Sequence, residues 1–395
     1  MMNRSNRLGF LTLAGMLVLL VLSCKPNYPD SVFNPNYDPG TSPSLSDITP
    51  ADSTWAGFQT ITIQGSNFAP NDFKTENTVF FNSTMCDILQ STPTSITIKS
   101  PLVTGDSVQV RVGITDAEQF SNSLYYKMKP AVQSIGNLEA STVVSAICTE
   151  PGTDNIWIST SANSLEQWDK NGKKLNSLTW AFLKAEALRF GSNGTLYAGV
   201  SVGRVKSIVA IDTSDGSYTS YAQLNKTPND IDFDADENIW VAAESQIMVV
   251  SSADASVQTA LVMPGELTSI CVTGNTLMVA GAQKVWQATI SGTTMGDTSL
   301  VTTLADQTIA SDATISSIEL ASGGNVYIGT DATDPILMLS GGTNYSTLYP
   351  DLMHPTITTM SWAYGPYILA IRQWTASGAQ TSDVLKIDVR ELGGM

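Results

Sequence analysis

An internal repeat in the last two thirds of the chain constrains the fold more than any other feature of the sequence. A pair of apolar residues recurs at successive spacings of 40, 43, 38, 49 and 42 residues. The pairs are Ile156-Trp157, Leu196-Tyr197, Ile239-Trp240, Leu277-Met278, Val326-Tyr327 and Ile368-Leu369. A polar turn separates each pair from another apolar residue, seven to nine positions earlier. These residues are Ile147, Leu188, Ile231, Ile270, Ile318 and Met360. Each unit therefore has the strand pattern of one four-stranded blade, and residues 129–395 are predicted to form a six-bladed β-propeller.

The two ends of the repeat region predict how the ring closes. The sixth unit offers a third strand at residues 384–389, but the residues after it make a poor fourth strand. Residues 131–135 precede the first unit and are similar to the outermost strands of other units. We expect residues 131–135 to pair with residues 384–389, because this pairing would complete the sixth blade and cover an open sheet edge.

The cysteines provide a second test of the blade count. Cys148 and Cys271 stand one residue after the first apolar residue of units one and four, on opposite sides of a six-bladed ring. A disulfide needs Cα atoms within about 7 Å, so these two cysteines should not be joined. We expect them, like Cys86, to be buried free thiols.

Residues 44–128 form a separate segment of short alternating strands between Gly, Pro and Asn turns, a pattern typical of a β-sandwich. The segments Ile48 to Pro50, Ile61 to Phe68, Val79 to Asn82 and Ile98 to Pro101 resemble an IPT/TIG domain over its whole length. The resemblance implies an immunoglobulin-like spacer or binding module without a catalytic site. It also implies that Gly65 and Asn67 shape a turn and that Phe68 fills the core.

The N-terminus predicts export. Arg4 and Arg7 precede an apolar run, Leu8 to Leu22, that is too short to remain as a membrane span. Residues 1–23 are therefore expected to be a signal peptide. The run ends in Val21-Leu22-Ser23-Cys24, which resembles the lipobox of bacterial lipoproteins, where the cysteine thiol is acylated. The resemblance implies a lipid anchor on Cys24 that tethers the mature chain to a membrane.

Residues 24–43 carry five prolines among polar residues and should form an extended tether. Lipoproteins of the Bacteroidetes type that reach the cell surface carry an acidic run just after the cysteine. Residues 25–30 are Lys-Pro-Asn-Tyr-Pro-Asp and lack such a run. The sequence therefore predicts an outer-membrane lipoprotein and leaves open whether it faces the periplasm or the cell surface.

The charge balance excludes some partners. The chain has 36 Asp and Glu residues against 20 Lys and Arg, and loss of Arg4 and Arg7 with the signal peptide gives 18 − 36 = −18. Such a surface repels nucleic acid.

His354 is the sole histidine, which excludes histidine-rich metal sites and argues against triad chemistry.

The third unit, Pro228 to Ala242, resembles a blade of the NHL and gluconolactonase-like propellers. The resemblance implies that Asn229 lies at the channel mouth, where such enzymes place a metal-binding asparagine beside carboxylates from other blades. The equivalent positions in the other units hold Ser145, Glu186, Thr268, Ser316 and Thr358. Because Glu186 is the one carboxylate among them, a metal-dependent hydrolase of a lactone or ester is the alternative function and not the favoured one.

Asp232, Asp234 and Asp236 imitate the start of a calcium loop, since oxygen ligands at alternate positions can surround a hard cation. However, Glu237 stands where such a loop needs glycine, and Ala243 stands where it needs a bidentate glutamate. We therefore expect an acidic hairpin and no cofactor, with calcium as the weaker alternative.

Tryptophans suggest a different kind of site, because an exposed indole is a common platform for a sugar ring. Trp168, Trp286 and Trp374 are candidates, although most aromatic residues should belong to blade cores.

The favoured function is a non-catalytic lipoprotein that presents a propeller face, or the groove beside the sandwich, to a glycan or a partner protein. Lipoproteins that join IPT/TIG and NHL-like modules resemble accessory proteins of polysaccharide uptake.

Overall fold

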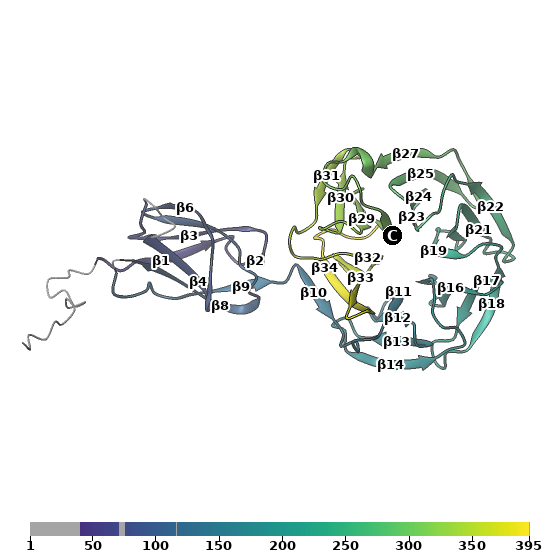
Figure 1. Ribbon diagram of the computed structural model, residues 1–395, viewed down its shortest axis with the longest axis horizontal. Coiled ribbons are helices and arrows are strands. Elements are labelled where there is room, and N and C mark those ends of the chain that lie inside the picture. The colour runs from purple at the N-terminus through teal and green to yellow at the C-terminus, as the bar shows by residue number, and fades with distance from the viewer. Residues whose placement is uncertain (1–39, 71–75, 116, 395) are drawn as a thin grey trace, which may run out of the picture.

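A computed structural model of the chain describes residues 40–70, 76–115 and 117–394. The expected signal peptide, Cys24 and the tether before Gly40 lie outside the described residues. Nearly all described residues form strands and turns, which confirms the all-β fold class. Figure 1 shows a small sandwich beside the rim of a ring of blades.

The sandwich contains β1 (Ser44–Thr49), β2 (Ser53–Trp55), β3 (Thr60–Ser66), β4 (Asn77–Phe81), β5 (Thr84–Met85), β6 (Ile88–Thr92), β7 (Ser95–Lys99), β8 (Gly105–Ile114) and β9 (Leu124–Lys129). The sheet orders are β1-β3-β7-β6 and β2-β9-β8-β4-β5. Alternate residues of β3 and β7 are buried, as a sheet with one covered face requires. Phe68 is buried in this core, and a Cβ on Gly65 would lie 2.0 Å from the Ser44 carbonyl oxygen, so only glycine fits there.

Six further sheets form the propeller. Blade 1 contains β11 (Val144–Thr149), β12 (Ile156–Thr160), β13 (Ser164–Trp168) and β14 (Lys174–Thr179), and blade 2 contains β15 (Ala187–Phe190), β16 (Leu196–Val202), β17 (Val205–Ile211) and β18 (Tyr218–Gln223). Blade 3 contains β19 (Pro228–Phe233), β20 (Ile239–Ala243), β21 (Gln246–Val250) and β22 (Val257–Val262). Blade 4 contains β23 (Ser269–Thr273), β24 (Thr276–Gly281), β25 (Lys284–Ser291), the short β26 (Thr294–Met295) and β27 (Ser299–Thr303), followed by the 3₁₀ turn Leu304–Asp306. Blade 5 contains β28 (Ile315–Leu320), β29 (Val326–Thr330), β30 (Ile336–Ser340) and β31 (Asn344–Thr347). Blade 6 contains β32 (Ile357–Trp362), β33 (Tyr367–Ala376), β34 (Ala379–Asp388) and, from the start of the domain, β10 (Val132–Ile135).

The ring closes as predicted. Strand β10 pairs antiparallel with β34, from Val132 opposite Ile387 to Ile135 opposite Val384. The boundary between blade 6 and blade 1, which we call the seam, is tightly packed. A Cβ on Gly136 would lie only 2.3 Å from the ring of Trp168. Cys148 and Cys271 are buried free thiols in blades 1 and 4, so the expectation that they are not joined is confirmed.

The C-terminal tail does not extend blade 6. The Ser322 amide donates to the Leu392 carbonyl, and the Gly394 amide donates to the Leu320 carbonyl. The Thr273 hydroxyl donates to the Gly394 carbonyl at 3.0 Å. Residues 390–394 thus cross the C-terminal ends of the innermost strands of blades 5 and 4, and Figure 1 places the chain end near the centre of the ring.

Aromatic rings join the two domains. The guanidinium of Arg390 lies 5.6 to 5.9 Å from the ring centroids of Trp55, Phe58 and Tyr349. The Trp55 indole N–H donates to the Asp388 carboxylate at 3.0 Å. Because Trp55 and Phe58 belong to the sandwich and the other residues to the propeller, these contacts hold the sandwich at the edge of blade 6.

Candidate functional site

The innermost strands place one residue each at the same level of the central channel. Each residue directly follows the buried apolar residue that marks its repeat, so all six occupy one register position of their strands. We call this set the channel ring: Cys148, Arg189, Asp232, Cys271, Glu319 and Ser361.

Arg189 of blade 2 connects the channel ring across the axis. Its Nε donates to the Ile231 carbonyl at 3.2 Å and lies 3.4 Å from an oxygen of Asp232 in blade 3. Its Nη1 donates to the Ser361 hydroxyl of blade 6 at 3.2 Å and lies 3.8 Å from Glu319 of blade 5. One guanidinium therefore contacts three other blades, which is the geometry of a structural tie across the channel.

Carboxylates of blade 3 also accept hydrogen bonds from blade 4. Asp230 accepts from the Ser269 hydroxyl at 2.7 Å and the Ile270 amide at 3.0 Å, and Asp232 accepts from the Val272 amide at 2.8 Å. Burial raises the pKa of both carboxyls, while the charge of Arg189 opposes part of that rise. The carboxylates of Asp230 and Asp232 are therefore bonded to groups of the protein itself.

The buried carboxyl of Glu319 should make the stability of the propeller depend on pH. Burial raises the pKa of its carboxyl from 4.5 to about 8, against the opposing charge of Arg189. The folded chain then keeps a proton that the unfolded chain releases, so this stabilisation is complete below the unfolded pKa and is lost as the pH rises through the folded pKa. We expect the Tm to fall by roughly 5 °C or more between about pH 5 and pH 8. In melting curves over this range, Glu319→Gln should remove most of the fall, and equal slopes for the variant and wild type would contradict the assignment.

The channel itself is narrow at its mouth, whereas a shallow hollow of about 520 Å³ opens to solvent on the other side of Asn229, beside Glu244 and Glu266. A cavity of about 40 Å³ is lined by residues that include Glu186, Asn229 and Thr268, whereas small-molecule sites usually measure about 300–1,000 Å³. The Asn229 amide nitrogen donates to the Leu267 carbonyl at 2.7 Å, and Glu186 pairs with Lys184 at 2.7 Å. The structure therefore brings Glu186 and Asn229 to one mouth, but both are bonded to neighbouring groups.

The equivalent hydroxyls of the other blades also donate to backbone carbonyls, and those of Ser145 and Thr358 do so within their own blades, at 3.1 and 3.3 Å. Thr268 donates to the Ile315 carbonyl at 3.0 Å, and Ser316 donates to the Ile357 carbonyl at 2.6 Å. Each of these two bonds joins one blade to the next. The bonds of Thr268 and Ser316 thus stabilise the ring, and the exposed carboxylate of Glu266 lies 3.5 Å from the Asn229 amide nitrogen.

The three aspartates of the calcium-like hairpin do not converge. Asp232 faces Arg189 in the channel, while the Asp234 carboxylate accepts from the side-chain nitrogens of Asn238 and Trp240, each at 2.9 Å. Asp236 is exposed at the turn. Within residues 40–70, 76–115 and 117–394, no group of three or more His, Cys, Asp or Glu side chains could hold a metal ion.

The predicted tryptophans lie in different environments. Trp168 is 1% exposed and its indole N–H donates to Glu166 at 3.0 Å, so the expectation that it offers a free ring face is wrong. Trp286 is half-buried against the core between blades 3 and 4. Trp374 is 37% exposed near the end of β33, beside the guanidinium of Arg372. Trp374 is therefore the member of the set with an accessible ring.

The sandwich matches a known domain family. Its residues 43–128 match the sequence model of the IPT/TIG domain. This part of the chain is an IPT/TIG domain. No curated protein matches the sequence.

Solved structures support the fold over most of the chain. A protein of Bacteroides thetaiotaomicron provisionally named a phosphatase has a TM-score of 0.60 at 10% identity, over 89% of this chain and 98% of its own. An auxiliary nutrient binding protein of Bacteroides ovatus has a TM-score of 0.52 at 11% identity, over 89% and 99%. The calcium-binding protein regucalcin of Agrobacterium tumefaciens has a TM-score of 0.53 at 13% identity, over 66% and 95%. At these identities the likeness establishes the fold alone.

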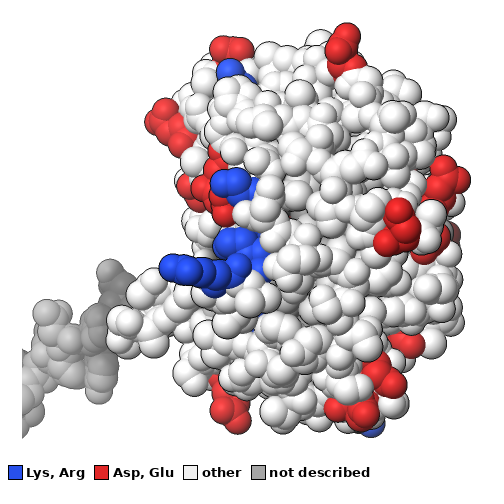
Figure 2. All heavy atoms as spheres, turned by 90° about the vertical axis from the view of Figure 1, so that its right-hand side faces the viewer, with Lys and Arg blue, Asp and Glu red and all other residues white. Residues whose placement is uncertain are grey.

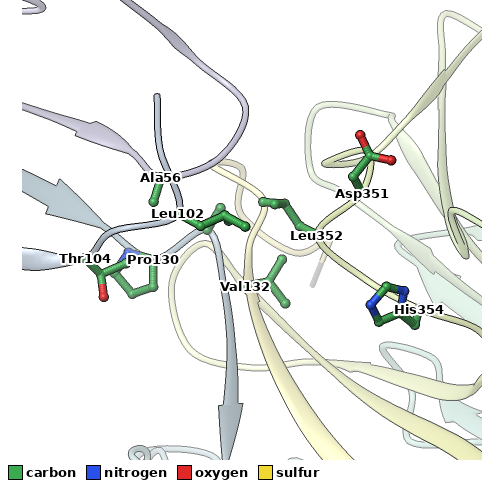
Figure 3. Close-up of a pocket in the computed structure, with 9 residues that line it drawn as sticks. Ala56, Leu102, Thr104, Pro130, Val132, Asp351, Leu352 and His354 are labelled. Atoms are coloured by element: carbon green, nitrogen blue, oxygen red, sulfur yellow. The ribbon is translucent and has the colours of Figure 1, made fainter. Parts of the chain in front are cut away.

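A hollow of about 300 Å³ lies where the IPT/TIG domain meets the propeller (Figure 3). In this view Leu102 of the IPT/TIG domain points toward Leu352 of the loop before β32, with Val132 of β10 beside them and His354 at the edge. Leu102 is 72% exposed. The boundary between the domains therefore leaves an apolar surface open to solvent.

The charge is spread thinly over the propeller rim opposite the IPT/TIG domain. Figure 2 shows acidic side chains in small separate groups, a few basic side chains gathered at one edge, and uncharged surface over most of the remainder. Charged residues are 14% of the chain. This side of the molecule offers no extended charged surface for a polyanion or polycation.

Sequence reasoning missed Arg189 and Glu319 as partners. The signal was present, because both stand at the repeat position already noted for Cys148 and Cys271. A comparison of that position in all six units would have placed Arg189 and Glu319 at one level of the channel. Their pairing depends on side-chain reach across the axis, which the repeat does not specify.

Proposed function

We propose that this protein is a membrane-anchored, non-catalytic binding protein that captures a glycan. The proposal rests on the central channel, which is narrow and filled by the protein's own side chains. Its charged groups pair with one another and its mouth cavity measures about 40 Å³, so the surface where a metal-dependent hydrolase would act is occupied by the protein's own contacts. Binding would then use surfaces outside the channel, such as the hollow at the domain boundary and the exposed ring of Trp374.

The hydrolase alternative receives less support. Glu186 and Asn229 would be its metal-binding residues, yet Glu186 pairs with Lys184 and Asn229 bonds to a backbone carbonyl. Among the solved structures of this fold, one is named an auxiliary nutrient binding protein, which supports a binding function on this architecture.

The anchor is part of the proposal. The apolar run before Cys24 and the lipobox-like residues around it support acylation of that cysteine. Within the described residues, no helix is both long and apolar enough to cross a bilayer. A lipid on Cys24 and a proline-rich tether would hold the two domains at an outer membrane, on the periplasmic side or at the cell surface.

One fractionation experiment tests both parts. We expect the full chain to sediment with membranes and those membranes to retain a soluble polysaccharide from a panel of plant, fungal and bacterial glycans. Cys24→Ala should shift the protein out of the membrane fraction, or leave it unprocessed, without abolishing retention, because the binding surface is in the folded domains.

Unchanged sedimentation of a Cys24→Ala protein that has lost residues 1–23 would contradict the anchor. Retention of no polysaccharide by either protein would contradict glycan capture. Turnover of a lactone or ester, lost when Asn229 and Glu186 are replaced, would instead favour the hydrolase.

A further inference from the structure

Blade 6 carries a hairpin that is longer than those of the other blades. Strands β33 and β34 have 10 residues each, whereas the central strands of blade 5 have 5 each. The register runs unbroken from Tyr367 opposite Asp388 to Ala376 opposite Ala379. The hairpin therefore continues beyond the part of the sheet that β32 and β10 cover, and its end is exposed.

One face of this hairpin holds a chain of polar and aromatic contacts. Trp374 stands two residues after Arg372, so both project from the same face of β33. The Arg372 guanidinium lies 4.9 Å from the indole centroid and forms two hydrogen bonds, at 2.9 and 2.7 Å, with the Asp383 carboxylate of β34. The exposed Ser134 hydroxyl of β10 lies 3.4 Å from the same carboxylate. These contacts join the three outer strands of blade 6.

The same face leads to the hollow beside the IPT/TIG domain. Val132 stands two residues before Ser134 on β10 and lines that hollow with His354, as Figure 3 shows. Val132, Ser134, Asp383 and Arg372 therefore lie on one face of the sheet, which extends from the domain boundary toward the tip of the hairpin. We call it the blade 6 strip and define it by Val132, Ser134, His354, Arg372, Trp374 and Asp383.

The chemistry of the strip matches a sugar. A pyranose ring presents C–H groups on its faces and hydroxyls at its edge, and each hydroxyl both donates and accepts hydrogen bonds. Trp374 supplies an accessible indole. Arg372 has five N–H groups, of which two are used on Asp383, so donors remain beside an acceptor carboxylate. A fixed donor and acceptor pair next to an aromatic ring provides the orientation that an uncharged, hydroxyl-rich ligand needs.

The charge and shape of the strip favour this ligand over others. Arg372 and Asp383 compensate each other, so the strip offers no net charge to a strongly ionic ligand. A stable protein interface needs roughly 1,000 Å² or more with an apolar centre, and the centre of the strip is this ion pair. A narrow surface with an indole at one end and a hollow at the other suits an extended chain of sugar units.

We propose that the blade 6 strip binds an oligosaccharide, with one sugar ring against Trp374, the hydroxyls of the next against Arg372 and Asp383, and the chain continuing toward the hollow. This inference rests on the proposed function and names its binding surface. Because the strip lies outside the channel, a long polysaccharide can bind by an internal segment without threading the channel.

The test uses the same polysaccharide panel with purified protein beginning at residue 25, in affinity gels and by calorimetry. Trp374→Ala should weaken binding of the retained polysaccharide about tenfold or more, which is a loss of about 1.4 kcal/mol. Trp374→Phe should keep part of the affinity, because it retains a ring. The matched control is Tyr218→Ala, which removes a 44% exposed aromatic side chain from the outer strand of blade 2 and should leave affinity unchanged. Melting temperatures measured for all variants separate loss of binding from loss of folding.

Each outcome decides between the two proposals. Binding that Trp374→Ala leaves intact would overturn the strip and preserve glycan capture. Equal losses in Trp374→Ala and Tyr218→Ala would also overturn the strip, because the effect would not depend on its surface. If no polysaccharide is retained and a photo-crosslinker at position 374 instead joins a membrane protein, the strip is a protein-docking surface and both proposals fail.

Discussion

Replacing Arg189 with methionine is expected to destabilise the propeller by about 3–5 kcal/mol, which corresponds to a fall in Tm of roughly 10 °C. The methionine keeps most of the buried volume but removes the cation from between Asp232 and Glu319. The Asp232 carboxylate must then be buried as an unpaired charge or take up a proton, and either change costs free energy. Urea unfolding followed by tryptophan fluorescence measures the loss.

The chain offers a control and a partial rescue for this prediction. Lys184→Met removes a cation whose pair with Glu186 is partly exposed, and should cost about 1 kcal/mol or less. Adding Asp232→Asn to Arg189→Met should recover part of the loss, because it removes the carboxylate that lies 3.4 Å from the guanidinium. An Arg189→Met protein as stable as wild type would show that the guanidinium is not a tie between blades.

Gly136→Ala is expected to open the seam between blades 6 and 1 at a cost of about 3 kcal/mol or more. The residue has a φ of +78°, and its new Cβ would meet the buried ring of Trp168 at 2.3 Å. That ring cannot easily move, because its indole N–H is bonded to Glu166, which is in turn paired with Lys174. Limited proteolysis should cut the variant near β10 faster than wild type.

Gly152→Ala provides the matched control. Gly152 has a nearly equal φ of +81°, but a Cβ there would meet nothing within 4 Å. It should therefore cost only the backbone strain of a positive φ, about 1–2 kcal/mol. Equal losses in the two variants would mean that the close packing on Trp168 contributes nothing to ring closure.

The fold could be predicted because each blade repeats a local pattern. The apolar pairs near Trp157 and Trp240 mark buried second strands, and residues 131–135 could be matched to a missing outer strand by pattern alone. The path of the C-terminal tail could not be predicted in this way. Residues 390–394 carry no strand pattern, and their position depends on backbone groups left free at the ends of the inner strands.

The candidate site was predicted less completely, for physical reasons that differ between residues. Asn229 and Glu186 were placed correctly at one mouth because strand register fixes their height. Their engagement by Leu267 and Lys184 depends on neighbouring loops that the repeat does not constrain. The sequence around Trp168 and Trp374 does not show which of the two rings is buried. Trp168 is buried because it packs against Gly136, a contact that the sequence pattern does not reveal.

The pairing of β10 with β34 also determines when the molecule becomes able to bind. Ser134 and Asp383 are 249 residues apart in the sequence, so β10 emerges early during synthesis and waits unpaired until the last hairpin has formed. Such distant contacts form slowly, and an unpaired edge strand is prone to association while it waits. Because the blade 6 strip contains residues from both ends of the propeller, a partly folded chain cannot present it. Ligand binding would therefore report completed folding, and only molecules with a closed ring would compete for a polysaccharide at the membrane.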